Sequence, residues 1–220
     1  MDTRIVIFDF DGTLADTRAA IVKAKQETSL MMSLPVASDE AYVATIGLSS
    51  KAGFAKVYPS LSDEQLDACV VGYRKFFEEI IKKDPPVRFP GADEVLAWLE
   101  EKGITRTIAT ARNTRSLHDF LRLWDWDKYF PYVLCQEDTP LLKPNPEPVL
   151  KTLKDLSFLP SEALVVGDMP VDIEMGKRAG AKTCGVSFGN SGRDALIKSG
   201  AGCVIDDFSE LVSVVEGLRT

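Results

Sequence analysis

The sequence predicts an α/β fold, a doubly wound parallel sheet with an inserted all-helical cap domain. Short runs of consecutive apolar residues recur along the chain, as is typical of parallel strands buried on both faces. Stretches with apolar residues at helical spacing lie between these runs, which is the alternation of a doubly wound sheet. One long segment near the N-terminus breaks the alternation and carries helical patterns alone.

The predicted strands and helices alternate through most of the chain. Residues 5–8 are all apolar and therefore predict a strand with both faces covered. Similar runs predict further strands at 107–109, 163–166, 183–186 and 203–205. Residues 92–102 predict a helix that ends at Gly103, because three apolar side chains lie on one face. Further helices are expected at 146–156, 171–179 and 209–218.

The segment from about residue 16 to residue 88 contains no apolar run that predicts a buried strand. Two helices are expected there, at 19–31 and at 63–83, and Ser62 is a suitable N-cap for the second. The proline-rich segment 84–91 marks the return to the strand–helix alternation. We therefore predict a core formed by residues 1–15 and 89–220, with residues 16–88 as the helical cap.

The composition is that of an acidic globular protein of 220 residues, with a formal net charge of −7. A negative surface argues against nonspecific binding to nucleic acid or to anionic membranes. The first residues lack the layout of a signal peptide, and no apolar run is long enough to span a bilayer. The four cysteines show no metal-ligand spacing and are expected to be reduced thiols. We expect a cytoplasmic protein, either monomeric or a weak homodimer.

Asp9 and Asp11 follow the first predicted strand directly. Ligands of open α/β sheets bind outside the carboxyl ends of the strands, so both carboxylates are expected at a binding site. They could hold a divalent cation or divide the roles of nucleophile and acid/base. Gly12 permits a tight turn, and the backbone amides of Gly12 and Thr13 are candidates for binding a phosphate. The alternative is an ordinary turn with two solvated aspartates.

Further candidates follow the other predicted strands. Thr110 follows the second strand, and its hydroxyl can donate to a phosphoryl oxygen. Lys143, in a proline-rich loop, can neutralise both a carboxylate and an incoming phosphate. Asp168 follows the third strand, and Asp172 lies in the first turn of the next helix, so both could face one cation. Each of these residues also has an ordinary interpretation as a cap, a surface lysine or a helix-start residue.

The segment DFDGTL at residues 9–14 resembles the first motif of the haloacid dehalogenase superfamily, most of whose members are phosphatases. Thr110, Lys143 and Asp168 occur in the order of its other three motifs. The resemblance covers essentially the whole chain. It implies a Rossmann-like core with a helical cap of the C1 type, similar to the phosphoglycolate phosphatase branch.

The resemblance also implies a magnesium site and a covalent mechanism. Mg²⁺ is expected to bind Asp9, the Asp11 carbonyl and Asp168, with Asp172 contacting it directly or through water. Asp9 would attack phosphorus and form an aspartyl-phosphate. Asp11 would protonate the leaving oxygen and later deprotonate the attacking water.

The substrate-binding candidates include positions where the chain departs from the superfamily pattern. Ala111 stands where the superfamily often has Asn, and Arg112 follows it. Relatives place a substrate-specificity loop around a cap glycine, which makes Ser50 and Lys51 candidate substrate contacts. By contrast, the loop at 189–192 is interpreted as a plain turn, with a place near the active site as the alternative. Gly12, Thr13, Ala111, Arg112, Ser50 and Lys51 are thus the predicted substrate-binding residues.

The predicted function is a Mg²⁺-dependent phosphatase that acts on a small phosphorylated metabolite, with a phosphoglycolate-like ester as one candidate. A sugar-phosphate mutase similar to β-phosphoglucomutase and a pyrophosphatase are the enzymatic alternatives. The mutase is disfavoured because Ile21, Ile46 and Ser50 stand where those enzymes carry histidine or basic residues. The non-enzymatic alternative is a binding or regulatory protein on the same fold.

Overall fold

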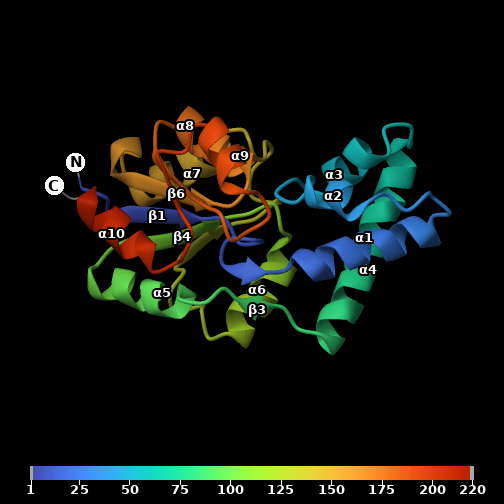
Figure 1. Cartoon of the computed structure of the whole chain (residues 1–220), viewed down its shortest axis with the longest axis horizontal. Helices are drawn as coiled ribbons and strands as arrows, with labels where there is room; N and C mark the ends of the chain where they lie inside the picture. Colours follow the sequence, from blue (N-terminus) through green and yellow to red (C-terminus); the bar gives the residue numbers. More distant parts are fainter. Residues whose placement is uncertain (1, 219–220) are drawn as a thin grey trace.

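The computed structural model describes residues 2–218 and contains a six-stranded parallel sheet flanked by helices (Figure 1). The strand order is β5-β4-β1-β6-β7-β8. The predicted doubly wound α/β fold is therefore confirmed. The strands are β1 (Ile5–Phe8), β4 (Thr105–Ala109), β5 (Tyr132–Leu134), β6 (Ala163–Gly167), β7 (Lys182–Val186) and β8 (Cys203–Ile205).

Strand β1 lies at the centre of the sheet, between β4 and β6. Ile5 is in register with Thr105 on one side and with Ala163 on the other. All four residues of β1 are fully buried, because helices cover both faces of the sheet here. The edge strand β5 was not predicted, since it is short and Tyr132 and Val133 are half-buried rather than enclosed.

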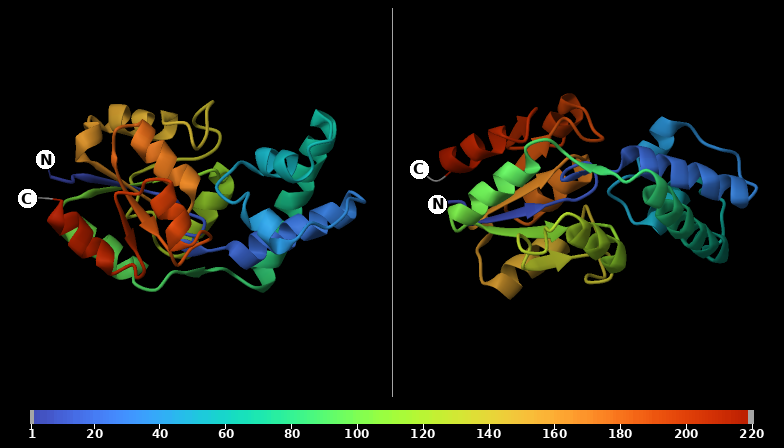
Figure 2. Two further views of the ribbon diagram at one scale, coloured as in Figure 1. Left: turned by 45° about the horizontal axis from the view of Figure 1, so that its top comes forward. Right: turned by 90° about the horizontal axis from the view of Figure 1, so that it is seen from below.

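Helices pack on both faces of the sheet (Figure 2). The side chains of Val6 and Phe8 belong to the apolar cluster that includes helices α5 and α10. Ile5 and Ile7 point to the opposite face, where they pack with α7 and α8. The helices of this part of the chain are α5 (Ala92–Glu101), α6 (Thr114–Leu123), α7 (Glu147–Leu156), the short 3₁₀ helix Pro160–Glu162, α8 (Pro170–Arg178), α9 (Arg193–Lys198) and α10 (Glu210–Gly217).

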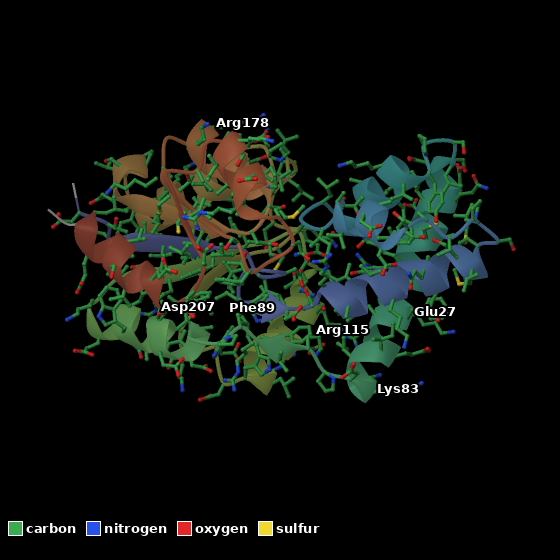
Figure 3. The ribbon with its side chains drawn as sticks, viewed as in Figure 1. Glu27, Lys83, Phe89, Arg115, Arg178 and Asp207 are labelled. Atoms are coloured by element: carbon green, nitrogen blue, oxygen red, sulfur yellow. The ribbon has the colours of Figure 1, made fainter. Side chains whose placement is uncertain are left out.

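The segment between β1 and α5 forms a helical lobe beside the carboxyl ends of the strands (Figure 1). Its helices are α1 (Arg18–Met31), α2 (Asp39–Val43), α3 (Ser50–Val57) and α4 (Asp63–Lys83). Ser62 caps α4 as predicted, since its hydroxyl accepts from the Gln65 amide in a capping box. Glu27 of α1 and Lys83 of α4 mark the two long helices in Figure 3.

Two short strands connect the helical lobe to the sheet. Strand β2 (Ala15–Asp16) leaves the sheet side and β3 (Val87–Arg88) returns to it, and the two pair antiparallel. The predicted cap boundaries at residues 16 and 88 fall on this pair. Among residues 2–218, no helix combines the length and apolarity that crossing a bilayer requires.

Candidate active site

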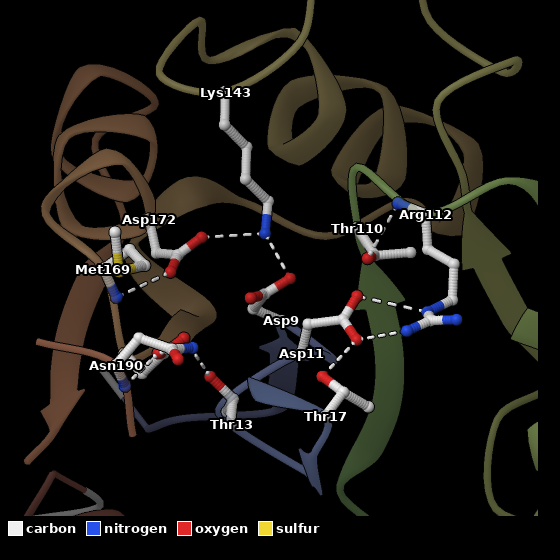
Figure 4. A network of polar contacts seen from close by, with 11 residues as sticks. Asp9, Asp11, Thr13, Thr17, Thr110, Arg112, Lys143, Met169, Asp172 and Asn190 are labelled. Atoms are coloured by element: carbon white, nitrogen blue, oxygen red, sulfur yellow. Dashed lines mark hydrogen bonds and ion pairs between the residues drawn. The ribbon is translucent and has the colours of Figure 1, made fainter. Parts of the chain in front are cut away.

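The candidate residues meet where strands β1, β4 and β6 end, facing the helical lobe (Figure 4). Asp9 follows β1, Thr110 follows β4 and Asp168 follows β6. Because these three strands are neighbours and run parallel, their carboxyl ends place the side chains at one edge of the sheet. All three residues are buried.

Lys143 lies between two carboxylates. Its ammonium donates to Asp9 Oδ1 at 2.5 Å and forms an ion pair with Asp172 Oδ1 at 2.7 Å. The other Asp172 oxygen accepts from the Met169 amide at 3.0 Å, which fixes the carboxylate at the start of α8. The three charged side chains of this ion-pair cluster are at most 2% exposed. The arrangement brings together residues that are far apart in the sequence, as predicted.

Three buried carboxylates form a possible metal site. Asp9, Asp168 and Asp172 each offer an oxygen within 4.8 Å of the others. Asp9 Oδ2 is buried and has no hydrogen-bond partner among the residues that the structure describes. Three carboxylates against the one ammonium of Lys143 leave an excess of negative charge, which a divalent cation with oxygen ligands would balance. The residues present therefore fit Mg²⁺.

Burial raises the pKa of two carboxyl groups in this cluster, Asp9 and Asp168. It raises the pKa of Asp9 to about 7, although the neighbouring Lys143 ammonium opposes the shift. Burial also raises the pKa of Asp168 well above its ordinary value, and the charges of Asp172 and Asp9 add to the effect. The pKa of Lys143 is raised: burial lowers it, but the attraction of Asp172 and Asp9 outweighs that effect.

Asn190 holds Asp168 in place and was missed by the interpretation of residues 189–192 as a plain turn. Its backbone amide and its side-chain amide both donate to Asp168 Oδ2, each at 2.7 Å. Thr13 donates from its hydroxyl to the other oxygen at 3.2 Å. The available signal was position: Asn190 follows β7, whose carboxyl end lies beside that of β6.

Gly12 is required by a close approach. Its φ is +87°, a left-handed conformation that favours glycine, and a Cβ atom there would lie 2.1 Å from Asn190 Nδ2 and 2.2 Å from Asp168 Oδ2. The predicted use of the Gly12 and Thr13 amides for phosphate binding does not agree with the structure. The first donates to the Ala15 carbonyl at 2.8 Å and the second to the Phe10 carbonyl at 3.3 Å, so both are used inside the turn.

Arg112, a predicted substrate contact, binds Asp11 and lines a cavity of about 290 Å³ that shares Asp11, Ser50 and Tyr73 with the site. Its Nε donates to Asp11 Oδ2 at 3.1 Å, and its Nη2 donates to Oδ1. Thr17 donates to the same carboxylate at 2.6 Å, and Arg112 also donates to the Ser116 hydroxyl at 2.6 Å. The guanidinium lies 4.8 Å from the ring centre of Phe77 in α4, so it links the Asp11 carboxylate to the helical lobe.

A small cavity of about 40 Å³ separates the sheet from the helical lobe. Ser50 and Ala111, two of the predicted substrate-binding residues, line this cavity. Lys51 does not: its ammonium forms ion pairs with Asp67 at 2.7 Å and Asp63 at 3.4 Å on the exposed side of α3. The lining residues are Asp9, Asp11, Ile21, Lys25, Thr45, Ile46, Gly47, Leu48, Ser50, Tyr73, Thr110 and Ala111.

Lys25 is a cavity residue that sequence reasoning missed. It is 4% exposed, and its ammonium donates to the Thr45 hydroxyl. Burial lowers the pKa of Lys25 to about 8, although the charge of Asp11 opposes the shift. A signal was present in the sequence, because Lys25 lies one helical turn after Ile21 on the buried face of α1.

Comparison with known families agrees with this geometry. The family model described as "Haloacid dehalogenase-like hydrolase" matches residues 6–186, which include every carboxylate of the site. The chain belongs to this family. The predicted resemblance to the haloacid dehalogenase superfamily and the prediction that the protein is a hydrolase are therefore confirmed.

Relatives of this hydrolase carry phosphatase names. A Clostridium perfringens protein named "Putative pyrophosphatase PpaX" is 33% identical over 218 residues, which cover 99% of each chain. The phosphoglycolate phosphatase of Salmonella typhimurium is 28% identical, with 95% of this chain and 91% of that protein covered. A hydrolase from Pseudomonas syringae shares the fold, with a TM-score of 0.89 and 24% identity over 99% of this chain and all of that one.

Proposed function

We propose that the protein is a Mg²⁺-dependent phosphatase that hydrolyses a small phosphate ester through an aspartyl-phosphate on Asp9. The observation that carries this proposal is the environment of Asp9. One oxygen of its buried carboxylate contacts Lys143 at 2.5 Å, while the other has no hydrogen-bond partner within residues 2–218. A nucleophile needs such an available oxygen, held in a fixed orientation by a neighbouring group.

The first half of the reaction depends on charge balance. Asp9 attacks phosphorus, and the Lys143 ammonium offsets the repulsion between this carboxylate and the phosphate dianion. The Thr110 hydroxyl accepts from the Arg112 amide at 3.2 Å, which leaves its proton free to be donated to a phosphoryl oxygen. Bound Mg²⁺ would supply further positive charge at the transferring group. Asp9, the Asp11 carbonyl and Asp168 are the proposed ligands, with Asp172 direct or through water.

Asp11 is the proposed acid and base. It lines the same cavity as Asp9, so its carboxyl can protonate the leaving oxygen and then accept a proton from the water that hydrolyses the intermediate. Arg112 and Thr17 hold the carboxylate in one orientation through three hydrogen bonds. In this role Arg112 is a positioning residue, which replaces its predicted role as a substrate contact.

The named relatives favour two small substrates, phosphoglycolate and pyrophosphate. The cavity of about 40 Å³ shares Asp11, Ser50 and Tyr73 with the cavity of about 290 Å³ that Arg112 lines, so the names of the relatives rather than cavity size support these two candidates. The mutase alternative is weaker, because the apolar side chains of Ile21 and Ile46 line the cavity where a mutase would need groups that bind a sugar phosphate. A purely binding protein is also disfavoured, since every position that the chemistry needs is occupied.

The test is phosphate release from p-nitrophenyl phosphate and from a panel of phosphorylated metabolites that includes phosphoglycolate and pyrophosphate. Turnover is expected with Mg²⁺ and is expected to stop with a chelator. The variant Asp9→Asn should lose at least about a thousandfold in kcat, while Asp119→Asn on the exposed face of α6 keeps full activity. Metal-independent turnover, or full activity of Asp9→Asn with deamidation excluded by mass spectrometry, would contradict the proposal.

A further inference from the structure

Lys25 is a buried ammonium that forms no direct ion pair with the carboxylates that the structure describes, although the charge of Asp11 acts on it from across the cavity. Its side chain comes from α1, and Lys25 lines the cavity together with Asp9 and Asp11. Among the described residues, no carboxylate forms an ion pair with it, and its hydrogen bond goes to the Thr45 hydroxyl. Burying an ammonium without a paired anion is costly, so packing alone does not explain a lysine at this position.

Thr45 orients the Lys25 ammonium. The Thr45 hydroxyl donates to the Tyr42 carbonyl at 2.6 Å, so its oxygen is left to accept from Lys25. An ammonium has three N–H groups, and Thr45 uses one of them. The remaining donors are available to a ligand in the cavity. Gly53 leaves room beside the ammonium, because a Cβ atom there would lie 3.4 Å from Lys25 Nζ.

Among the described residues that line the cavity, Lys25 is the only cation. The other lining residues of the helical lobe are apolar or neutral, with Ile21, Ile46 and Leu48 among them. Lys143 contacts Asp9 from the sheet side, where the proposed function uses it for the transferring phosphoryl group. Lys25 belongs to the opposite, lobe side, where the leaving group of a bound ester would lie.

We propose, on the basis of the phosphatase function above, that Lys25 determines specificity by binding an anionic group on the leaving part of the substrate. Lys25 lines the same cavity as Asp9 and Asp11, so an anion bound by Lys25 would lie close to the scissile oxygen. A carboxylate and a second phosphoryl group are both anions of this kind. An ester with a neutral leaving group of the same size would leave the Lys25 ammonium buried and unpaired, and it is expected to bind poorly.

The test is steady-state kinetics of the Mg²⁺-loaded enzyme with matched substrates. Phosphoglycolate and pyrophosphate carry an anionic leaving group, and 2-hydroxyethyl phosphate is the neutral counterpart of phosphoglycolate. Lys25→Met should lower kcat/KM for the preferred anionic substrate at least about 30-fold, mainly through KM, because it removes a buried charge partner. Turnover of 2-hydroxyethyl phosphate should change less than about threefold. The control is Lys23→Met on the exposed face of the same helix.

The outcomes separate this proposal from the proposed function. A preference for phosphoglycolate that Lys25→Met removes would identify a carboxylate as the bound group, and the same result with pyrophosphate would identify a phosphoryl group. Equal losses on charged and neutral substrates would overturn the role of Lys25 while the phosphatase function stands. The absence of phosphate release from these compounds, from p-nitrophenyl phosphate and from the metabolite panel would overturn the phosphatase function itself. Lys25→Gln, with thermal unfolding of both variants, provides a second test should Lys25→Met fold poorly.

Discussion

Asp9, Lys143 and Asp172 show how the chemistry of single residues depends on charges a few ångströms away. One ammonium lies between two carboxylates, at 2.5 Å and 2.7 Å, with a third carboxylate, Asp168, close by. Such a cluster is stable in a buried place only when its charges are balanced. The second oxygen of Asp9 has no hydrogen-bond partner among the described residues, so the surrounding charges determine the protonation of this carboxyl group.

Lys25 leads to a prediction about stability and pH. Its pKa is about 8 in the folded protein, against 10.5 for an ordinary lysine, so the folded state disfavours its charged form. Between these values the unfolded chain binds more protons than the folded one, and stability therefore rises with pH across this window. Below pH 8 the folded state bears the full free-energy cost of burying the charged Lys25 ammonium. Lys25→Met should then be more stable than the wild type at pH 7, by on the order of 1–3 kcal/mol.

The measurement for Lys25→Met is urea unfolding of both proteins from pH 7 to pH 10.5. The difference in unfolding free energy should shrink as the pH passes from 8 to 10.5. Asp9, Asp11 and Tyr73, the other titratable groups that line the cavity, are present in both proteins, so the difference isolates Lys25. A variant that is less stable than the wild type by the same amount at every pH would contradict the prediction.

Arg112 should matter for turnover more than for binding. Arg112→Ala removes two hydrogen bonds that orient Asp11, and kcat is expected to fall about 10- to 100-fold with a smaller change in KM. Arg112→Lys should not restore kcat, because an ammonium cannot reproduce the two-point contact. Arg122→Ala, which removes an exposed guanidinium from α6, the helix that follows Arg112, is the control. An unchanged kcat in Arg112→Ala would exclude the positioning role.

Among the helices and strands, the sequence predicts those whose position depends on a local pattern of apolar residues. Consecutive apolar residues identified β1 and β6 because a strand covered on both faces cannot alternate. The edge strand β5 lacks that pattern because it is half-covered. The side chains at the strand ends were predictable because parallel strands end together. Arg112 and Lys51 were misplaced because their nearest counter-charges, Asp11 and the acids of α4, follow from tertiary packing.

Gly12, in the turn after β1, and Gly103, which follows helix α5, form a matched pair of glycines for substitution. Gly12 and Gly103 both have a positive φ, +87° and +66°, but only Gly12 has neighbours within 4 Å of an added Cβ atom. Gly103→Ala should cost about 1–2 kcal/mol of unfolding free energy through backbone strain alone. Gly12→Ala should cost at least about 2 kcal/mol more, because the new methyl group displaces Asp168 and Asn190.

Urea unfolding and Mg²⁺ titration check the two glycine variants. Only Gly12→Ala should weaken Mg²⁺ binding, since Asp168 is a proposed ligand. Equal losses of unfolding free energy and unchanged Mg²⁺ affinity in both variants would contradict this prediction. They would show that the close approach of Gly12 to Asp168 is not needed for Mg²⁺ binding.

For the molecule as a whole, the buried carboxylates predict that the metal stabilises the fold. Mg²⁺ at 100 times its Kd should add about 2.7 kcal/mol, or on the order of 5–10 °C in Tm for a chain of this size. Asp168→Asn should abolish the shift, and Asp119→Asn on the surface should keep it. Thermal unfolding with Mg²⁺ or with a chelator measures the effect. A shift that survives in Asp168→Asn would place the ion elsewhere.

The two lobes also make contact through the loop around Gly47. This residue has a φ of +90°, and a Cβ atom there would lie 3.1 Å from Val171 Cγ2 and 3.6 Å from Met169 Cγ. Met169 and Val171, at the start of α8, therefore pack against the Gly47 loop of the helical lobe. Gly47 also lines the cavity of about 40 Å³ that contains Asp9 and Asp11, so this contact lies directly beside the candidate active site.

The central position of β1 has a consequence for how the chain acquires its structure during synthesis. β1 is made first, but its partners on the two sides begin at Thr105 and Ala163. The helical lobe, whose contacts are local, can form on the ribosome well before then. Strand β1 can pair on one side only after Thr105 has been made, and on the other side only after Ala163. The strand that leads to Asp9 is therefore enclosed on both sides only once β6 has been synthesised.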